Sequence, residues 1–225
     1  MFLSNPAKSF LAGALALIIL AGCGSGPDDQ NTGVPSVPEI KSEFPFSTKE
    51  PETFQCEMVI TAGETVHRTF IAKKGVKRRV DYNFGQANQH SLLQTDKDYI
   101  ISYARKVYAE FSAGTNLSTA EGPWDEFTSR LLNKRGRAEI EEMGTEGNLK
   151  VFKITNWESG LSEILIYVDP AIGIPVRQEF FSINGDQKTL QYSVEFRNLV
   201  VEVDDSLFEI PKNLQKVSQA NFNLK

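Results

Sequence analysis

The sequence predicts a mainly-β protein built on one antiparallel sheet. Three observations support this prediction. From Phe54 onward, apolar and polar residues alternate in short runs. Gly, Asn and Asp separate most of these runs, as they do in β-hairpins. A single stretch after Gly122 breaks the alternation with helical spacing.

The first 22 residues have the pattern of an export signal. Lys8 supplies a positive charge, and an apolar run from Phe10 to Leu20 follows it. A membrane-spanning helix needs roughly 20 apolar residues, so this shorter run fits a cleavable signal peptide over residues 1–22. These residues are therefore left out of the fold prediction.

The residues Leu20-Ala21-Gly22-Cys23 resemble the lipobox of bacterial lipoproteins. The resemblance implies cleavage before Cys23 and attachment of lipid to its thiol, with two or three acyl chains such as palmitate anchoring the mature protein in a membrane. Gly24, in place of an Asp, implies the outer membrane, facing the periplasm. The alternative is an ordinary secretory signal in which the cysteine occurs by chance.

The mature chain divides into a tether and one domain. Residues 23–53 form the lipidated N-terminus and a segment rich in Gly, Ser, Pro and Asp, which predicts a flexible or extended tether. Residues 54–225 suit a single domain in length. Lys8 leaves with the signal, so 23 of the 24 Lys and Arg residues remain against 29 acidic ones, a net charge of −6. This balance argues against a nucleic-acid partner.

The domain contains eleven expected strands and one expected helix. The helix is predicted over residues 123–135, with Pro123 near its start, Phe127, Leu131 and Leu132 on one face, and Gly136 at its end. The strands are predicted at residues 54–60, 66–73, 76–82, 91–95, 99–102, 106–111, 138–144, 149–156, 161–168, 174–183 and 188–200.

Two segments resemble proteins related to the LolA/LolB lipoprotein carriers. Residues 166–177 (IYVDPAIGIPVR) are similar to a strand-turn-strand signature of that group, and residues 203–211 (VDDSLFEIP) to its closing element. In the first, Asp169-Pro170 ends a strand and Gly173 permits a positive φ. The resemblance implies an unclosed antiparallel half-barrel of about eleven strands, curved around an apolar cavity under a helical lid. In the carriers this cavity holds acyl chains.

Aromatic and other large apolar residues are the candidate ligand-binding residues. They could line an apolar cavity or fill a closed core, and both interpretations remain open at this stage. The candidates are Phe54, Met58, Phe70, Tyr82, Tyr99, Phe111, Trp124, Phe127, Leu131, Phe152, Trp157, Tyr167 and Phe180.

The sequence offers little support for catalysis or a metal. His67 and His90 have no Cys or His cluster beside them, and no Ser lies in a Gly-x-Ser-x-Gly context. Cys56 lies in an alternating apolar run, which indicates a buried structural thiol rather than a nucleophile. We therefore expect a protein that is not an enzyme and has no cofactor or metal.

One basic group, Lys73-Lys74 and Lys77-Arg78-Arg79, surrounds a predicted hairpin. It could face anionic lipid headgroups or be an ordinary solvated turn. The leading hypothesis is a membrane-anchored lipoprotein that binds acyl chains or another hydrophobic ligand, with a role in lipid or lipoprotein sorting. The alternative is a non-enzymatic interaction module in a cell-envelope assembly.

Overall fold

The computed structural model describes residues 44–115, 124, 138–156 and 162–222. These residues form twelve strands and two short 3₁₀ helices, η2 (Asp205–Phe208) and η3 (Gln219–Asn221). The strands are β1 (Thr53–Ala62), β2 (Thr65–Lys74), β3 (Lys77–Tyr82), β4 (His90–Gln94), β5 (Asp98–Ser102), β6 (Val107–Phe111), β7 (Ala138–Glu146), β8 (Leu149–Asn156), β9 (Ser162–Asp169), β10 (Ile174–Asn184), β11 (Gln187–Val200) and β12 (Gln215–Lys216).

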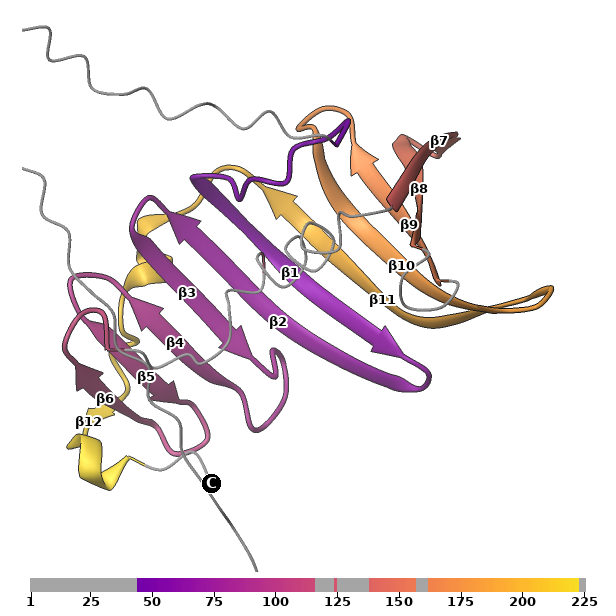
Figure 1. Ribbon diagram of the computed structural model, residues 1–225. Coiled ribbons are helices and arrows are strands. Elements are labelled where there is room, and N and C mark those ends of the chain that lie inside the picture. The colour runs from indigo at the N-terminus through magenta and orange to yellow at the C-terminus, as the bar shows by residue number, and fades with distance from the viewer. Residues whose placement is uncertain (1–43, 116–123, 125–137, 157–161, 223–225) are drawn as a thin grey trace, which may run out of the picture. The chain divides into compact units, whose positions relative to one another are not determined.

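All twelve strands belong to one sheet, in the order β12-β6-β5-β4-β3-β2-β1-β11-β10-β9-β8-β7 (Figure 1). Every neighbouring pair is antiparallel except β12 and β6, which run parallel. Within the described residues the sheet is unclosed, with β12 and β7 at its two ends. The predicted fold class, a mainly-β unclosed antiparallel sheet, is confirmed. The strand that the prediction lacked is β12, which has two residues.

The strand registers define two faces of this sheet, because successive side chains of a strand point to opposite sides. We call the side that carries Phe54, Cys56 and Met58 of β1 the front face. The side that carries Gln55 and Glu57 is the back face. In Figure 1 the C-terminal segment with η2 passes behind β3, so the view is toward the front face.

Three apolar clusters lie on these two faces. The central front cluster contains Phe54, Cys56, Met58, Ile71, Trp124, Ile174, Val194 and Phe196. The second front cluster, toward β8 and β9, contains Phe46, Phe152, Ile154, Ile166 and Val168. The back cluster contains Ala72, Leu93, Ile101, Val203 and Phe208, so the C-terminal segment covers the back of β2 to β5.

Residues 44–52, which we call the strap, belong to the folded domain. Phe46 is only 5% exposed, and the Ser47 amide donates a hydrogen bond to the Gly173 carbonyl at 2.9 Å. At the other end, the Gly75 amide donates to the Glu52 carbonyl at 2.9 Å. The segment expected to be a tether therefore packs against the sheet from residue 44, because two aromatic side chains in it find an apolar surface.

Several predicted features lie outside the described residues. They are the signal peptide, Cys23, the tether up to residue 43 and, except for Trp124, the helix expected at 123–135. Among the residues that are described, no helix is both long enough and apolar enough to span a membrane.

Candidate ligand-binding face

The centre of the front face is an apolar surface under a tryptophan. Phe54, Cys56 and Met58 reach it because β1 alternates in register with β2 and β11, its neighbours on either side. The Trp124 ring stacks on Phe196, with ring centroids 5.2 Å apart and planes at 15°, and it lies 5.5 Å from the Phe54 ring. Trp124 is 1% exposed, packs on these side chains and is not itself a residue of any strand.

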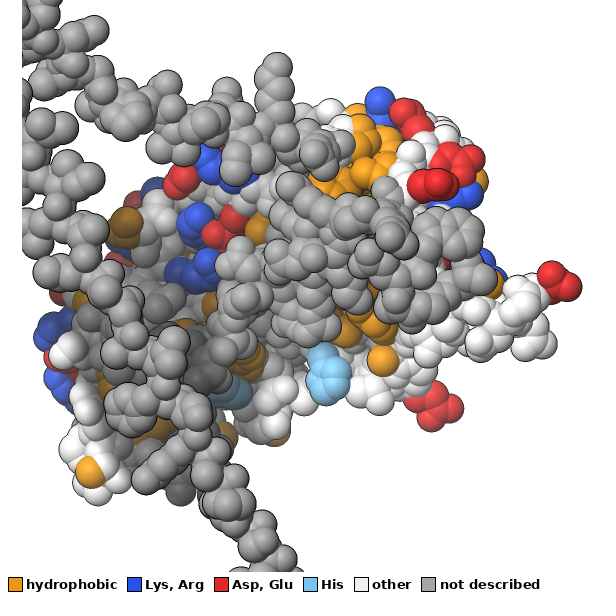
Figure 2. Space-filling view, viewed as in Figure 1, with side chains coloured by type: hydrophobic (Ala, Val, Ile, Leu, Met, Phe, Trp, Pro, Cys, Tyr) orange, Lys and Arg blue, Asp and Glu red, His pale blue; other side chains and the backbone are white. Residues whose placement is uncertain are grey.

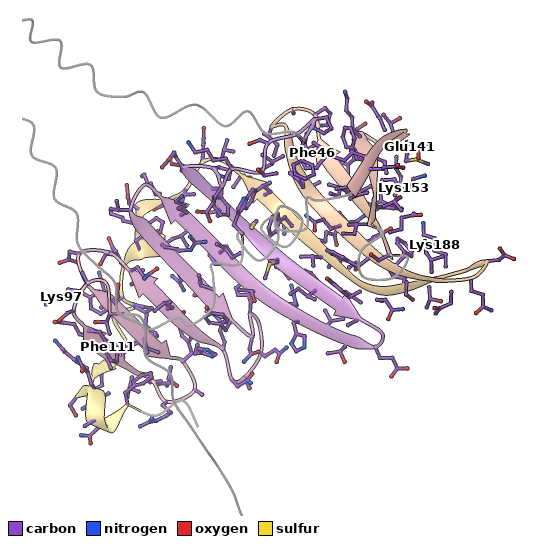
Figure 3. The ribbon with its side chains drawn as sticks, viewed as in Figure 1. Phe46, Lys97, Phe111, Glu141, Lys153 and Lys188 are labelled. Carbon is purple, nitrogen blue, oxygen red and sulfur yellow. The ribbon has the colours of Figure 1, made fainter. Side chains whose placement is uncertain are left out.

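The second front cluster lies under the strap. The Phe46 ring lies 5.4 Å from the Phe152 ring on β8, and Phe44 stacks on Phe46 at 5.4 Å. Ile166 of β9, fully buried, completes the surface below them. Figure 3 places Phe46 near the upper ends of β9 and β10, and Figure 2 shows hydrophobic side chains at the molecular surface in this region.

The two covering side chains are connected to each other. The Trp124 Nε1–H donates a hydrogen bond to the Thr48 carbonyl of the strap at 3.2 Å. Thr48 lies two residues after Phe46. A movement of the strap would therefore disturb the cover of both front clusters.

A less covered apolar rim borders the central cluster. Phe180 of β10 and Tyr192 of β11 are partly exposed and stack with ring centroids 4.2 Å apart. Ile60, also partly exposed, packs against the same cluster from β1. An apolar ligand could reach the front face here without crossing a strand.

The strap also carries a buried charge to the front face. The Glu50 carboxylate accepts hydrogen bonds from Lys73 at 2.8 Å and from Arg78 at 2.7 and 3.3 Å. These three side chains are only 16–20% exposed. Lys73 and Arg78 are register partners on β2 and β3 and share the front face with Phe54. Figure 2 shows acidic and basic side chains together over this part of the sheet.

The remaining members of the predicted basic group are also paired within the chain. Lys74 and Lys77 contact the Asp205 carboxylate of η2 at 2.7 and 3.2 Å. Arg79 points to the back face and pairs with Asp81. All five cations of the group therefore have acidic partners within the chain.

The structure divides the candidate ligand-binding residues into three sets. Phe127, Leu131 and Trp157 lie outside the described residues. The registers put Phe70, Tyr99 and Tyr167 on the back face, so these three cannot line a front-face site. The front face carries Phe54, Met58, Tyr82, Phe111, Phe152 and Phe180 from the strands, with Trp124 packed on it.

The front-face candidates do not all come together. Phe54, Met58 and Trp124 belong to the central cluster, and Phe180 packs against it. Tyr82 instead stacks on His90, with centroids 5.1 Å apart. Phe111, on β6, lies at the end of the sheet opposite Phe46 in Figure 3. The candidate site is therefore the part of the front face that runs, in sheet order, from β2 through β1, β11, β10 and β9 to β8.

The back-face candidates have structural partners. Phe70 and Tyr99 pack against the back cluster that the C-terminal segment covers. The Tyr167 hydroxyl donates a hydrogen bond to Glu179 at 2.9 Å, and the Arg177 guanidinium lies 3.6 Å from the centre of the Tyr167 ring. Each of the three rings therefore has partners on the back face.

The described residues contain no cluster of potential metal ligands, and their one cysteine is buried. Among them, no three His, Cys, Asp or Glu side chains lie close enough to hold a metal ion. Burial, with smaller contributions from the charges of Glu50 and Glu57, raises the pKa of Cys56 to about 12. Its thiol is thus protonated at neutral pH and is a poor nucleophile.

Fold and site together define an open antiparallel sheet whose apolar front face is covered by side chains from outside the strands. No family model matches the sequence, and a search of curated proteins found no match. The solved structures that are similar to this chain include the following three. The crystal structure of MucB has 14% identity and a TM-score of 0.48, and the match covers 73% of this chain and 59% of MucB. This chain therefore spans about three fifths of the MucB chain.

The other two structures have lower scores. An uncharacterized conserved protein from Thermus thermophilus has 10% identity and a TM-score of 0.43, with 75% of this chain and 91% of that chain covered. LprF from Mycobacterium bovis has 11% identity and a TM-score of 0.41, with 74% and 91% covered.

Proposed function

We propose that the front face binds the apolar part of a ligand, an acyl chain being the best match, without chemical conversion of that ligand. The observation that carries the proposal is that two side chains cover the two front clusters. They are Phe46 and Trp124, neither of which belongs to a strand. Both side chains can leave without breaking a strand pair, and an acyl chain that replaces them gains roughly 25 cal/mol for each Å² of apolar surface removed from water.

We also propose that this binding takes place at a bacterial membrane. The support is the sequence Leu20-Ala21-Gly22-Cys23 with its preceding apolar run. Lipid on Cys23 would hold the domain at the periplasmic side of the outer membrane, where acyl chains and lipoproteins are available as ligands. A role in lipid or lipoprotein sorting fits this place.

The anchor is tested by expressing the full chain and a Cys23→Ser variant with radiolabelled palmitate in a bacterial host. The parent should incorporate label and sediment with outer membranes, whereas the variant should lose the label and no longer sediment with outer membranes. Equal labelling of both proteins would rule out Cys23 as the lipidated residue.

Ligand binding is tested on the exported Cys23→Ser chain by mass spectrometry of lipids extracted after purification. Phe180→Asp puts a charge on the front-face rim, and the adjacent Phe181→Asp puts the same charge on the back face beside Lys188. We expect co-purifying acyl lipid with the parent and with Phe181→Asp, and about tenfold less with Phe180→Asp, because the buried charge would lack a partner.

The outcome also separates the two functional hypotheses. Equal lipid content in both variants, or no lipid in the parent, would contradict the proposal. If the parent carries no lipid but captures an envelope protein that a chain restricted to residues 23–43 does not capture, the interaction-module alternative is favoured instead.

A further inference from the structure

We propose that the ligand of the front face is an anionic amphiphile, and that the strap occupies its site in the present structure. In this proposal Phe46 occupies the position of the ligand's hydrocarbon chain. Glu50 occupies the position of its anionic headgroup, in contact with Lys73 and Arg78. The inference rests on the proposed function and adds to it the headgroup site, the class of ligand and an internal competitor.

The strap has the chemistry of such a ligand. It places an aromatic side chain on an apolar surface and, four residues later, a carboxylate between two cations. Four residues of extended chain span at most about 14 Å, which is within the length of a common fatty acyl chain. A single long-chain carboxylate or phosphate monoester could therefore contact both places at once.

The cations give the site its preference for an anion. Among the described residues, Glu50 is the acid that pairs with both Lys73 and Arg78. These side chains are mostly buried, so removal of Glu50 leaves two charges with little water and no counter-charge, which is unfavourable. A neutral ligand that displaces the strap leaves them in this state. An anionic ligand restores the pairing.

The strap is held in a way that allows displacement. It is not a strand of the sheet, and Pro45, Ser47 and Lys49 are exposed. Its backbone hydrogen bonds include those at Ser47, Thr48 and Glu52 described above. The ligand would replace the Phe46 ring contact and the Glu50 ion pairs, and release of these contacts together with the backbone bonds would uncover the front face.

The test compares three probes with the same twelve-carbon chain, each used below its critical micelle concentration. Dodecanoate is anionic, dodecanol is neutral and dodecyltrimethylammonium is cationic. Binding to the full Cys23→Ser chain is measured by titration calorimetry, and inorganic phosphate serves as a probe of the headgroup site without a chain. We expect dodecanoate to bind about tenfold or more tightly than dodecanol, and the cationic probe to bind most weakly.

Variants identify the contacts. Glu50→Gln should tighten dodecanoate binding about tenfold, since it removes the competing charge. Glu52→Gln changes an exposed carboxylate on the same strap and should leave the affinity unchanged. Lys73→Gln with Arg78→Gln should abolish the preference for dodecanoate over dodecanol. Phe46→Ala should strengthen binding of dodecanoate and of dodecanol, because it removes the side chain that competes with the hydrocarbon chain. Circular dichroism and thermal unfolding of each variant confirm that it is folded.

Each outcome has a defined meaning. If dodecanol binds as tightly as dodecanoate, and both are lost in Phe180→Asp, the inference fails while the proposed function stands. A weaker affinity for dodecanoate in Glu50→Gln also overturns the inference, because it would make Glu50 part of the site rather than a competitor. If none of the three amphiphiles binds to any variant, the proposed function and the inference both fail.

Discussion

Arg79 and Asp81, two residues apart on β3, form a two-bonded ion pair on the back face of the sheet. Arg79 Nε and Nη2 donate to the two carboxylate oxygens at 2.8 and 3.0 Å. The same guanidinium donates to the Leu207 carbonyl at 3.0 Å and to the Tyr103 hydroxyl at 2.7 Å, and the Ser91 hydroxyl donates to Asp81. This polar network connects β3 and β4 to the C-terminal segment.

Replacement of Asp81 should destabilise the domain strongly. Asp81 is 2% exposed, so Asp81→Asn leaves the Arg79 guanidinium without its counter-charge in a mostly buried place. We expect a loss of about 3–5 kcal/mol in the free energy of unfolding, measured by urea denaturation. Asp186→Asn, at the exposed β10–β11 turn, is the control and should change the free energy by less than about 0.5 kcal/mol. Similar losses in both variants would contradict a special role of the ion pair.

The Glu57–Arg68 pair should make stability depend on pH in the acid range. The hydrogen bond from Arg68 holds the pKa of Glu57 below its ordinary value. The unfolded chain then binds the proton more readily than the folded one. The stabilisation is therefore present above the unfolded pKa of about 4.3 and is lost as the pH falls through the lower folded value.

This dependence is measured by comparing unfolding free energies of the parent and Glu57→Gln between neutral pH and pH 3. The parent should be the more stable protein at neutral pH, and the difference should shrink below about pH 4.3. A difference that stays constant over the range would show that Glu57 acts through packing alone.

The Cys56 thiol should be nearly inert in the folded protein. A pKa raised from 9.0 to about 12 lowers the thiolate fraction at pH 8 about a thousandfold, and burial blocks access to the sulfur as well. Alkylation by iodoacetamide is followed by mass spectrometry in the Cys23→Ser chain, in which Cys56 is the remaining cysteine. We expect rapid labelling in urea and very slow labelling in buffer. Comparable rates would mean that β1 opens frequently.

The turn between β9 and β10 should be sensitive to replacement of its glycine. Gly173 has φ of +68°, and its amide donates to the Asp169 carbonyl at 2.7 Å. No neighbouring atom lies within 4 Å of the place that a Cβ would take, so the cost of Gly173→Ala is one of backbone conformation, about 1–2 kcal/mol. Gly173→Asn should cost less, because Asn tolerates this conformation better. Thermal unfolding of the two variants gives the comparison.

The sequence was sufficient for the strands because period-two alternation and turn residues are local signals. The sequence also contained information on which face of the sheet each side chain occupies, which a list of aromatic residues does not give. The two-residue turn at Gly63 and Glu64 fixes the β1–β2 register, which puts Phe70 opposite Glu57 and on the back face. Counting from this turn would have separated Phe70 from Phe54 and Met58.

The strap could not be recognised in the same way. Its Pro residues and its position beside a long polar segment give it the composition of a tether, and Phe44 and Phe46 are too few to form a periodic pattern. Only the tertiary structure provides the apolar surface under Phe46 and the two cations around Glu50. The site therefore depends on contacts between segments distant in the sequence, which composition does not report.

The position of β1 in the middle of the sheet has a consequence for how the chain folds. Its neighbour β2 follows at once, but its other neighbour, β11, is near the end of the sequence, and Thr61 pairs with Ser193. Strands β1 to β6 can pair with sequence neighbours early in folding, whereas Val194 and Phe196 reach the central cluster only when nearly the whole domain is present. Closure of so long a loop is slow, and β1 remains an exposed apolar edge until it occurs. Joining β1 to β11 is thus the step at which the two halves of the sheet become one domain.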